Sequence, residues 1–148
     1  MEVLVISLSS PLKIGIYHDD NLIKEYIKSE QTSEILPIVF EEILNKYKPT
    51  ALFFAKGPGS FMAIKVSYIF LKTLSITLGV KLFGCDGFEF NQCEPIRAMR
   101  KVYFIKENGN ITTKLFKEEL AQNFNLPSRL EKEIFSSDCE PLYILPAV

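Results

Sequence analysis

The stretch that decides the fold is Gly57-Pro58-Gly59-Ser60-Phe61. It follows the apolar run Ala51–Ala55 and opens an almost wholly apolar segment that ends near Leu78. An apolar run, a glycine turn and a longer apolar segment predict a strand that leads into a buried helix. Backbone N–H groups at such a turn can bind phosphate or another anion, so the turn is also a candidate nucleotide site.

Two interpretations of this turn compete. In the functional one, Gly57, Gly59 and Ser60 bring backbone N–H groups to an anionic cofactor. In the structural one, the glycines let the chain turn sharply and let the helix pack on the strand, with Ser60 as N-cap. Neither the Lys-Ser/Thr pair of a P-loop nor a complete dinucleotide fingerprint follows. The sequence therefore favours the structural interpretation and predicts no cofactor.

The residues before the turn predict an antiparallel meander followed by a helix. Three β-rich runs occupy 3–8, 13–17 and 22–28, and the polar cluster His18-Asp19-Asp20-Asn21 suits a hairpin between the last two.

A first helix is expected from Glu34 to about Tyr47, with Ser33 as N-cap and Pro37 in its first turn. A short strand at 81–83 follows the second helix. The resulting α/β order, β-β-β-α-β-α-β, is that of a ribonuclease-H-like half-domain, the unit that the actin-like ATPase superfamily duplicates.

After Glu94-Pro95 the sequence changes character. We predict an N-terminal lobe over 1–95 that carries both helices, which are also the expected partner-binding elements for the reason given below, and a reduced second lobe over 96–148 that is too small to be a normal independent domain. The predicted elements of the second lobe are a hairpin of strands 101–106 and 110–116, two weak helical pieces within 118–135, and a final strand at 142–145.

Composition limits the function classes. The chain has 148 residues, 47% of them hydrophobic, and carries 17 basic and 18 acidic residues for a net charge of −1. This balance shows no overall electrostatic footprint for independent nucleic-acid binding, so a role in RNA chemistry would need a partner. Cys85, Cys93 and Cys139 are too few and too widely spaced for a disulfide framework or a zinc site, and predict free thiols in a reducing cytoplasm.

Nothing at the N-terminus has the pattern of a signal peptide, and Lys65 and Lys72 interrupt the longest apolar stretch, so we expect a cytoplasmic protein without a membrane span.

Candidate catalytic groups are scarce. The sequence has one histidine, His18, which we expect in a solvated turn. The neighbouring pairs Asp19/Asp20 and Glu41/Glu42 are expected in a solvated turn and on an exposed helix flank. The first three strands hold too few carboxylates for a magnesium-dependent nuclease. We predict neither catalytic residues nor a metal site.

Both helices carry more apolar surface than one sheet needs. On the second helix, apolar residues lie on the face that would pack on the sheet and also on the opposite face, around Lys65 and Lys72. The first helix is apolar over about half its circumference. This surplus predicts a helical interface with a partner; the alternative is that the C-terminal part of the chain covers it. The predicted interface consists of Ile35, Val39, Phe40, Ile43, Phe61, Lys65, Tyr68, Ile69, Lys72 and Ile76.

At this point the motifs resemble the TsaB (YeaZ) family of bacterial threonylcarbamoyladenosine synthesis. The family wordings GPGSFTGLR and GVSSLE are similar to the segments that begin at Gly57 and Gly84, and its IDTST and HSERLLP segments are similar to 6–10 and 31–37. Arg100–Tyr103 and 141–143 resemble strands of the family's second lobe, whose match is thinner. The departures from the family wording are Ser7 for aspartate, Gln31 for histidine, Met62 for threonine, Ala63 for glycine and Lys65 for arginine.

The resemblance implies a non-catalytic relative of the TsaD carbamoyltransferase that pairs with TsaD through these two helices. It would help form the platform for the ATPase TsaE and would meet tRNA only indirectly. Without its partner, the same apolar face could form a homodimer. A small kinase-like or hydrolytic enzyme that uses the turn from Gly57 to Ser60 for a nucleotide is the alternative.

Overall fold

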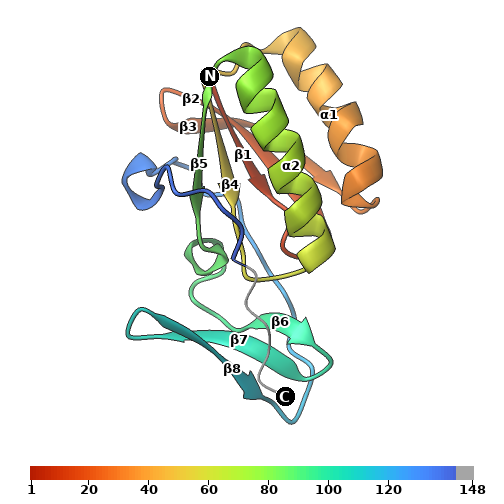
Figure 1. The fold of residues 1–148 in the computed structure, drawn as a ribbon, viewed down its shortest axis with the longest axis vertical. Helices are drawn as coiled ribbons and strands as arrows, with labels where there is room; N and C mark the ends of the chain where they lie inside the picture. The colour runs from red at the N-terminus through yellow and green to blue at the C-terminus, as the bar shows by residue number, and fades with distance from the viewer. Residues whose placement is uncertain (143–148) are drawn as a thin grey trace.

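A computed structural model describes residues 1–142. They form a five-stranded sheet with two helices on one face, and a separate three-stranded sheet beside one end of it (Figure 1). The helices and strands are β1 (Glu2–Ile6), β2 (Leu12–His18), β3 (Asn21–Lys28), α1 (Thr32–Lys46), β4 (Ala51–Ala55), α2 (Phe61–Leu78), β5 (Lys81–Cys85), the 3-10 turn η1 (Gly87–Phe90), β6 (Ile96–Met99), β7 (Val102–Glu107), β8 (Asn110–Leu115) and the 3-10 turn η2 (Lys132–Ile134).

The large sheet has the strand order β3-β2-β1-β4-β5. The first three strands form the predicted antiparallel meander, and β4 and β5 are parallel to β1, as the two α crossovers require. The predicted β-β-β-α-β-α-β order is thus confirmed. The hairpin after His18 is confirmed too, because Asp19 and Asp20 adopt φ values of 49° and 67°, which a tight two-residue turn needs.

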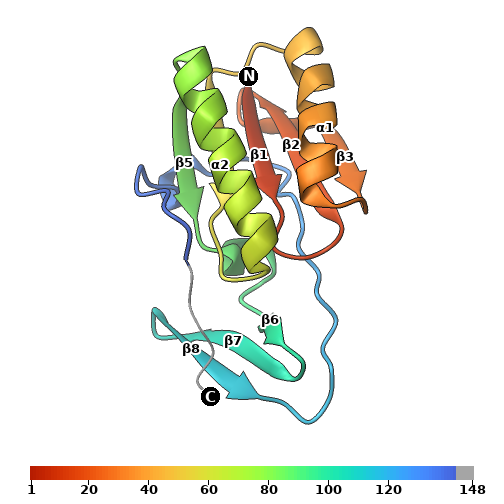
Figure 2. The ribbon, with the colours of Figure 1, turned by 45° about the vertical axis from the view of Figure 1, so that its right-hand side comes forward.

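The two faces of this sheet carry separate cores. Alternate residues of the buried central strand β1 point to opposite faces, so Val3 and Val5 meet the helices while Leu4 and Ile6 face the other way. Helices α1 and α2 lie side by side over the first face (Figure 2). Because β1 and β4 are buried on both sides, they read as continuous apolar runs rather than as alternating ones.

Residues 116–142, here called the C-terminal segment, run back from the small sheet and cover the second face of the large one (Figure 1). Phe124, Leu130 and Phe135 are buried there. The expectation of two helical pieces is wrong, since η2 is the one helical turn within residues 116–142. The backbone pairs with the large sheet instead of with itself: Ser136 exchanges two hydrogen bonds of 2.9 Å with Gly84.

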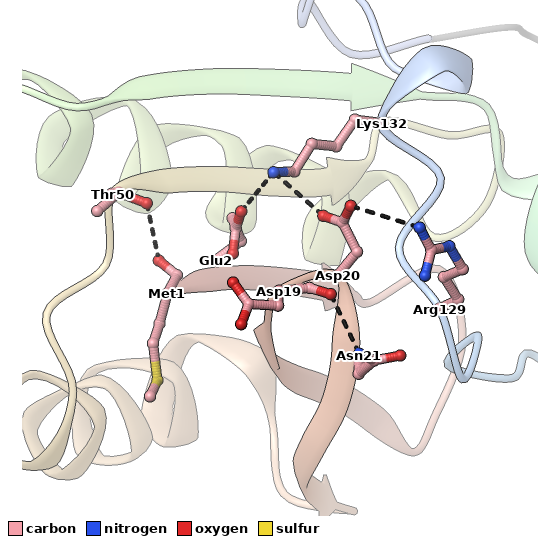
Figure 3. A network of polar contacts seen from close by, with 8 residues as sticks. All are labelled: Met1, Glu2, Asp19, Asp20, Asn21, Thr50, Arg129 and Lys132. Carbon is pink, nitrogen blue, oxygen red and sulfur yellow. Dashed lines mark hydrogen bonds and ion pairs between the residues drawn. The ribbon is translucent and has the colours of Figure 1, made fainter.

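An ion-pair cluster fixes this segment to the hairpin and to β1 (Figure 3). Lys132 Nζ lies 2.5 Å from Glu2 Oε1 and 3.1 Å from Asp20 Oδ1, and Arg129 approaches the other oxygen of Asp20 at 3.9 Å. Asp19 is exposed as expected, but Asp20 is drawn into this cluster and is not simply a solvated turn residue.

The start of α1 differs from the prediction. Gln31, not Ser33, occupies the N-cap position, and its carbonyl accepts the N–H groups of Glu34 and Ile35 at 3.0 Å each. No side chain caps this end. Because the helix begins two residues earlier than expected, Pro37 lies in its second turn and points to solvent.

The small sheet has the order β6-β7-β8. The predicted hairpin of β7 and β8 is confirmed, with left-handed φ values at Asn108 and Gly109. Strand β6 was not predicted, because it is short and its register with β7 shifts between Arg97 and Met99. The predicted final strand at 142–145 lies, apart from Leu142, outside the described residues.

Candidate partner interface and glycine turn

The glycine turn between β4 and α2 packs directly on the end of β1. The Ser60 N–H donates to the Leu8 carbonyl at 3.0 Å, and the Gly87 N–H donates to the Gly57 carbonyl at 2.8 Å. A Cβ atom at Gly59 would lie 2.8 Å from the Leu8 carbonyl oxygen, so only glycine fits without movement. Ser60 holds the N-cap position of α2 without a side-chain capping bond. These contacts support the structural interpretation of the turn.

Two cavities flank the turn, and both include Ser9, Ser10 and Ser60 in their walls. The larger one, of about 510 Å³, lies between the turn and β6, and Arg97 is its one charged lining residue. Arg97 is paired with Glu119 at 3.5 Å. The smaller cavity, of about 370 Å³, lies between the N-terminal ends of α1 and α2. Within residues 1–142, no group of three or more His, Cys, Asp or Glu side chains could hold a metal.

Ser7, where the resembled family has aspartate, lines the smaller cavity but is almost fully buried against α2. Its side chain is 3% exposed, and its Oγ lies 2.5 Å from Oγ of Ser67 on α2. The hydroxyl at this position therefore links a strand to a helix. A neutral side chain in such a contact cannot position a metal ion as a carboxylate would.

The other polar candidates lie apart from these cavities. The His18 side chain is 58% exposed in the hairpin, 3.5 Å from Asp19, as predicted for a solvated turn residue. Glu41 and Glu42 are on the exposed flank of α1, where Glu42 pairs with Lys46 at 3.3 Å. The predicted positions of these residues are confirmed.

The cysteines are free thiols, as predicted. Cys85 and Cys139 are buried, whereas Cys93 is exposed. Burial raises the pKa of the Cys85 thiol, and the nearby carboxylates of Asp86 and Glu89 raise it further. Cys85 is therefore an unreactive protonated thiol at neutral pH.

Helix α2 is far less buried than the sequence predicts. Of its 18 residues, Ile64, Ser67, Leu71 and Ser75 are buried. In length and composition it is the one helix within residues 1–142 that could cross a membrane, but in this structure it lies on the sheet and contacts α1. Its exposed large apolar side chains are Phe61 (39%), Met62 (70%), Ile69 (53%), Ile76 (73%) and Leu78 (40%).

The exposed residues include the stripe that the sequence predicts. Phe61, Lys65, Ile69, Lys72 and Ile76 recur at helical spacing and all are exposed. A shallow, mainly apolar groove of about 420 Å³ runs beside this stripe along α2. The groove is lined by Val66, Ile69, Phe70, Thr73, Leu74 and Thr77.

The α1 half of the predicted interface needs correction. Ile35, Val39, Phe40 and Ile43 are 8%, 4%, 1% and 0% exposed, respectively, and belong to the core. They pack in the core with residues of the sheet, and Phe40 also contacts α2, where its ring lies 5.3 Å from that of Phe70.

Tyr68 is partly buried against the core, and its ring is stacked 6.0 Å from that of Phe54 on β4. The exposed large apolar residues of α1 are Ile38 and Leu44, neither of which is among the predicted interface residues. The broad apolar face of α1, predicted from the sequence as a partner interface, thus packs on the sheet and on α2.

Comparison with known proteins adds sequence and structural relatives. No protein-family model matches the sequence. The TsaB protein of tRNA threonylcarbamoyladenosine biosynthesis from Buchnera aphidicola is 29% identical over 94 residues, which cover 57% of this chain. The match spans 42% of that relative's length.

Two solved structures from Pseudomonas aeruginosa share the fold. One is YeaZ, with a TM-score of 0.56, and the other is an uncharacterized protein with similarity to peptidase YEAZ, with a TM-score of 0.59. Each is 12% identical and covers 84% of this chain, which covers 71% and 70% of theirs. The sequence comparison supports the resemblance to the TsaB (YeaZ) family, and the structural comparison shows that this chain shares the fold of YeaZ, in agreement with the predicted order of strands and helices.

Proposed function

We propose that this chain is a non-catalytic accessory subunit of the machinery that forms threonylcarbamoyladenosine beside the anticodon of tRNA. In this role it binds and stabilises a TsaD-like carbamoyltransferase. The observation that carries the proposal is the exposed apolar stripe of α2, on a chain whose motifs and fold are TsaB-like. A stripe with Ile69 half-exposed and Ile76 73% exposed is a surface that a soluble protein normally covers.

The shape of this surface suits a helical partner. The exposed apolar residues Met62, Ile69 and Ile76 recur every seven residues. With Lys65 and Lys72 beside them, they favour helix-on-helix packing with acidic side chains at the rim of the partner. The groove beside the stripe offers a place for large apolar side chains of that partner. The same surface would pair two copies of this chain when the partner is absent.

A non-catalytic role agrees with the residues available. The sequence has a single histidine, which argues against a metallopeptidase, and Ser7 is engaged with Ser67. In the proposed complex, the transfer chemistry belongs to the TsaD-like subunit, TsaE is recruited to the joint platform, and the compartment is the cytoplasm.

Co-purification with a TsaD homologue tests the proposal. We expect the wild-type chain to bind it and the Ile69→Glu variant to lose at least tenfold in affinity, because the new carboxylate would be buried in an apolar contact. Ile27→Glu is the matched control, since Ile27 on β3 is 54% exposed and Ile69 is 53% exposed. Equal binding by the two variants would contradict the proposed interface.

A second candidate function is nucleotide binding by the chain itself, favoured by the cavity of about 510 Å³ beside Gly59. Calorimetry with ATP and magnesium tests it. Binding that is weakened by Arg97→Gln, whose side chain lines that cavity, would favour this enzyme-like alternative. Absence of heat at millimolar ATP would exclude it.

A further inference from the structure

The small sheet is strongly basic although the whole chain is not. Residues 96–117 contain six basic residues and one acidic residue, Glu107, whereas the remaining residues contain eleven basic and seventeen acidic ones. The net charge of −1 therefore conceals two parts of opposite sign. The basic part coincides with strands β6, β7 and β8, which lie apart from the helices (Figure 1).

Four of these cations gather at one end of the small sheet. Arg100 and Lys101 form the turn between β6 and β7, and the Phe116 N–H donates to the Lys101 carbonyl at 2.8 Å, which brings Lys117 next to them. Lys114 stands opposite Tyr103 in the β7–β8 register. We call Arg100, Lys101, Lys114 and Lys117 the basic cluster.

The basic cluster is exposed and electrostatically unpaired. All four side chains are exposed, and none forms an ion pair with another residue among 1–142. Lys114 Nζ instead lies 5.3 Å from the centre of the Phe116 ring. The nearest acidic residues in the sequence are Glu118 and Glu119, and Glu119 is already paired with Arg97.

Neutral hydrogen-bonding groups extend the cluster along edge strand β8. Asn110, Thr112 and Lys114 alternate along the strand and are exposed. Lysine and arginine with neighbouring amide and hydroxyl groups are the side chains that contact phosphate and sugar in nucleic-acid complexes. A membrane surface would be bound by cations and exposed apolar side chains, and such binding does not explain the amide and hydroxyl groups along β8.

From this arrangement we infer that the basic end of the small sheet is an RNA-binding surface that contacts the phosphate backbone of the tRNA directly. The inference rests on the proposed function and changes one part of it, because the chain itself then meets the RNA. Recognition here is of charge and backbone and carries no base specificity.

Charged residues near a sheet edge have a second common role, which is to prevent edge-to-edge aggregation. Lys114 on β8 serves that role by position. Arg100, Lys101 and Lys117 lie in a turn and beyond the strand end, where no edge needs protection. These three residues are therefore the ones whose replacement distinguishes RNA binding from edge protection.

Fluorescence anisotropy with a labelled, unmodified tRNA transcript tests the inference on the full chain. The test variant is Arg100→Gln/Lys101→Gln/Lys117→Gln, and the control is Lys24→Gln/Lys48→Gln/Lys81→Gln, three exposed lysines of the other part of the chain. We expect the test variant to lose at least tenfold in affinity at low salt and the slope of log K against log salt to fall by about three. The control should keep the wild-type slope.

Equal losses in both variants, or none in the test variant, would overturn the inference. So would binding to vesicles rich in phosphatidylserine with no binding to the transcript. A parallel pull-down with the TsaD homologue separates this result from the proposed function. If the test variant captures that protein and still binds RNA as the wild type does, the RNA surface is wrong and the accessory role stands; if capture fails in the wild type, the accessory role is wrong.

Discussion

The hydroxyl oxygens of Ser7 and Ser67 lie 2.5 Å apart, and the two side chains are 3% and 1% exposed. This contact joins the chain just after β1 to the middle of α2. A buried hydroxyl that loses its partner keeps its desolvation cost without its hydrogen bond. The pair therefore stabilises the docking of α2, at a position where the resembled TsaB (YeaZ) family has aspartate.

Ser7→Ala and Ser67→Ala should each lower the free energy of unfolding by about 1–2 kcal/mol, because each leaves one buried hydroxyl unsatisfied. The double variant should cost less than the sum of the two, since it removes both hydroxyls together. Urea denaturation of the four proteins measures the coupling. Strict additivity would mean that the hydrogen bond does not contribute to stability.

Gly59 and Gly87 both contact Leu8, and shortening the Leu8 side chain should affect substitutions at the two glycines differently. A Cβ at Gly87 would lie 2.1 Å from Leu8 Cδ1, whereas one at Gly59 would lie 2.8 Å from the Leu8 carbonyl oxygen. Both Gly→Ala variants should lose about 1–3 kcal/mol of stability through overpacking. Adding Leu8→Ala should rescue Gly87→Ala, because it removes the clashing methyl group, but not Gly59→Ala, whose clash is with the backbone.

Gly79→Ala is the control for that experiment. Gly79 follows α2 in the left-handed region, with φ of 69°, and a Cβ there would meet no atom within 4 Å. Its cost should be the backbone strain alone, about 1–2 kcal/mol, and unaffected by Leu8→Ala. Thermal unfolding of the three glycine variants, of Leu8→Ala and of the three double variants provides the comparison. If Leu8→Ala also restored stability to Gly79→Ala, the recovery at Gly87 would not be due to removal of a local clash.

The large sheet was predicted well from the sequence because its strands are marked by local patterns. Ala51–Ala55 was predicted to the residue, and the meander to within two residues at each strand end, since apolar runs and turn residues mark them directly. The C-terminal segment was missed because its order comes from contacts with β1, β5 and the hairpin, which are distant in sequence. Local pattern cannot report such a conformation.

The candidate site was predicted only in part, for two physical reasons. The apolar stripe of α2 follows from helical periodicity, but the same periodicity cannot say whether Ile35 and Ile43 of α1 face a partner or a neighbouring helix. The basic cluster was missed because charge was counted over the whole chain. Counting charges strand by strand shows the excess of basic residues in 96–117. Their clustering follows only from the fold, because Lys117 comes near the turn at Arg100 when β7 and β8 pair.

The ion pair between Lys106 and Asp86 joins the small sheet to the end of β5, with Nζ and Oδ2 2.6 Å apart. Asp86 also caps η1 by accepting the Phe88 N–H at 2.9 Å. The hydrogen bond to Asp86 raises the pKa of Lys106 above its ordinary value. The pair therefore stabilises the fold fully below the lysine's unfolded pKa of about 10.4 and loses this effect as pH rises through the raised value.

Lys106→Met should accordingly lower the free energy of unfolding by about 1–3 kcal/mol at neutral pH, because it leaves the mostly buried Asp86 without its cation. The difference from the wild type should be constant between about pH 8 and pH 10 and shrink above that. Urea denaturation as a function of pH measures it. Lys101→Met, at an exposed lysine, is the control and should show no such dependence.

Thiol reactivity tests the described burial of the cysteines. Cys93 is exposed, whereas Cys85 and Cys139 are buried, and burial raises the pKa of the Cys85 thiol. Because the thiolate is the reactive form, Ellman's reagent should label one thiol per native chain rapidly and the other two only as the protein unfolds. Cys93→Ser should abolish the rapid phase and leave the slow one unchanged. Rapid labelling of a second thiol in the native protein would mean that the C-terminal segment, which contains Cys139, does not stay closed over the sheet.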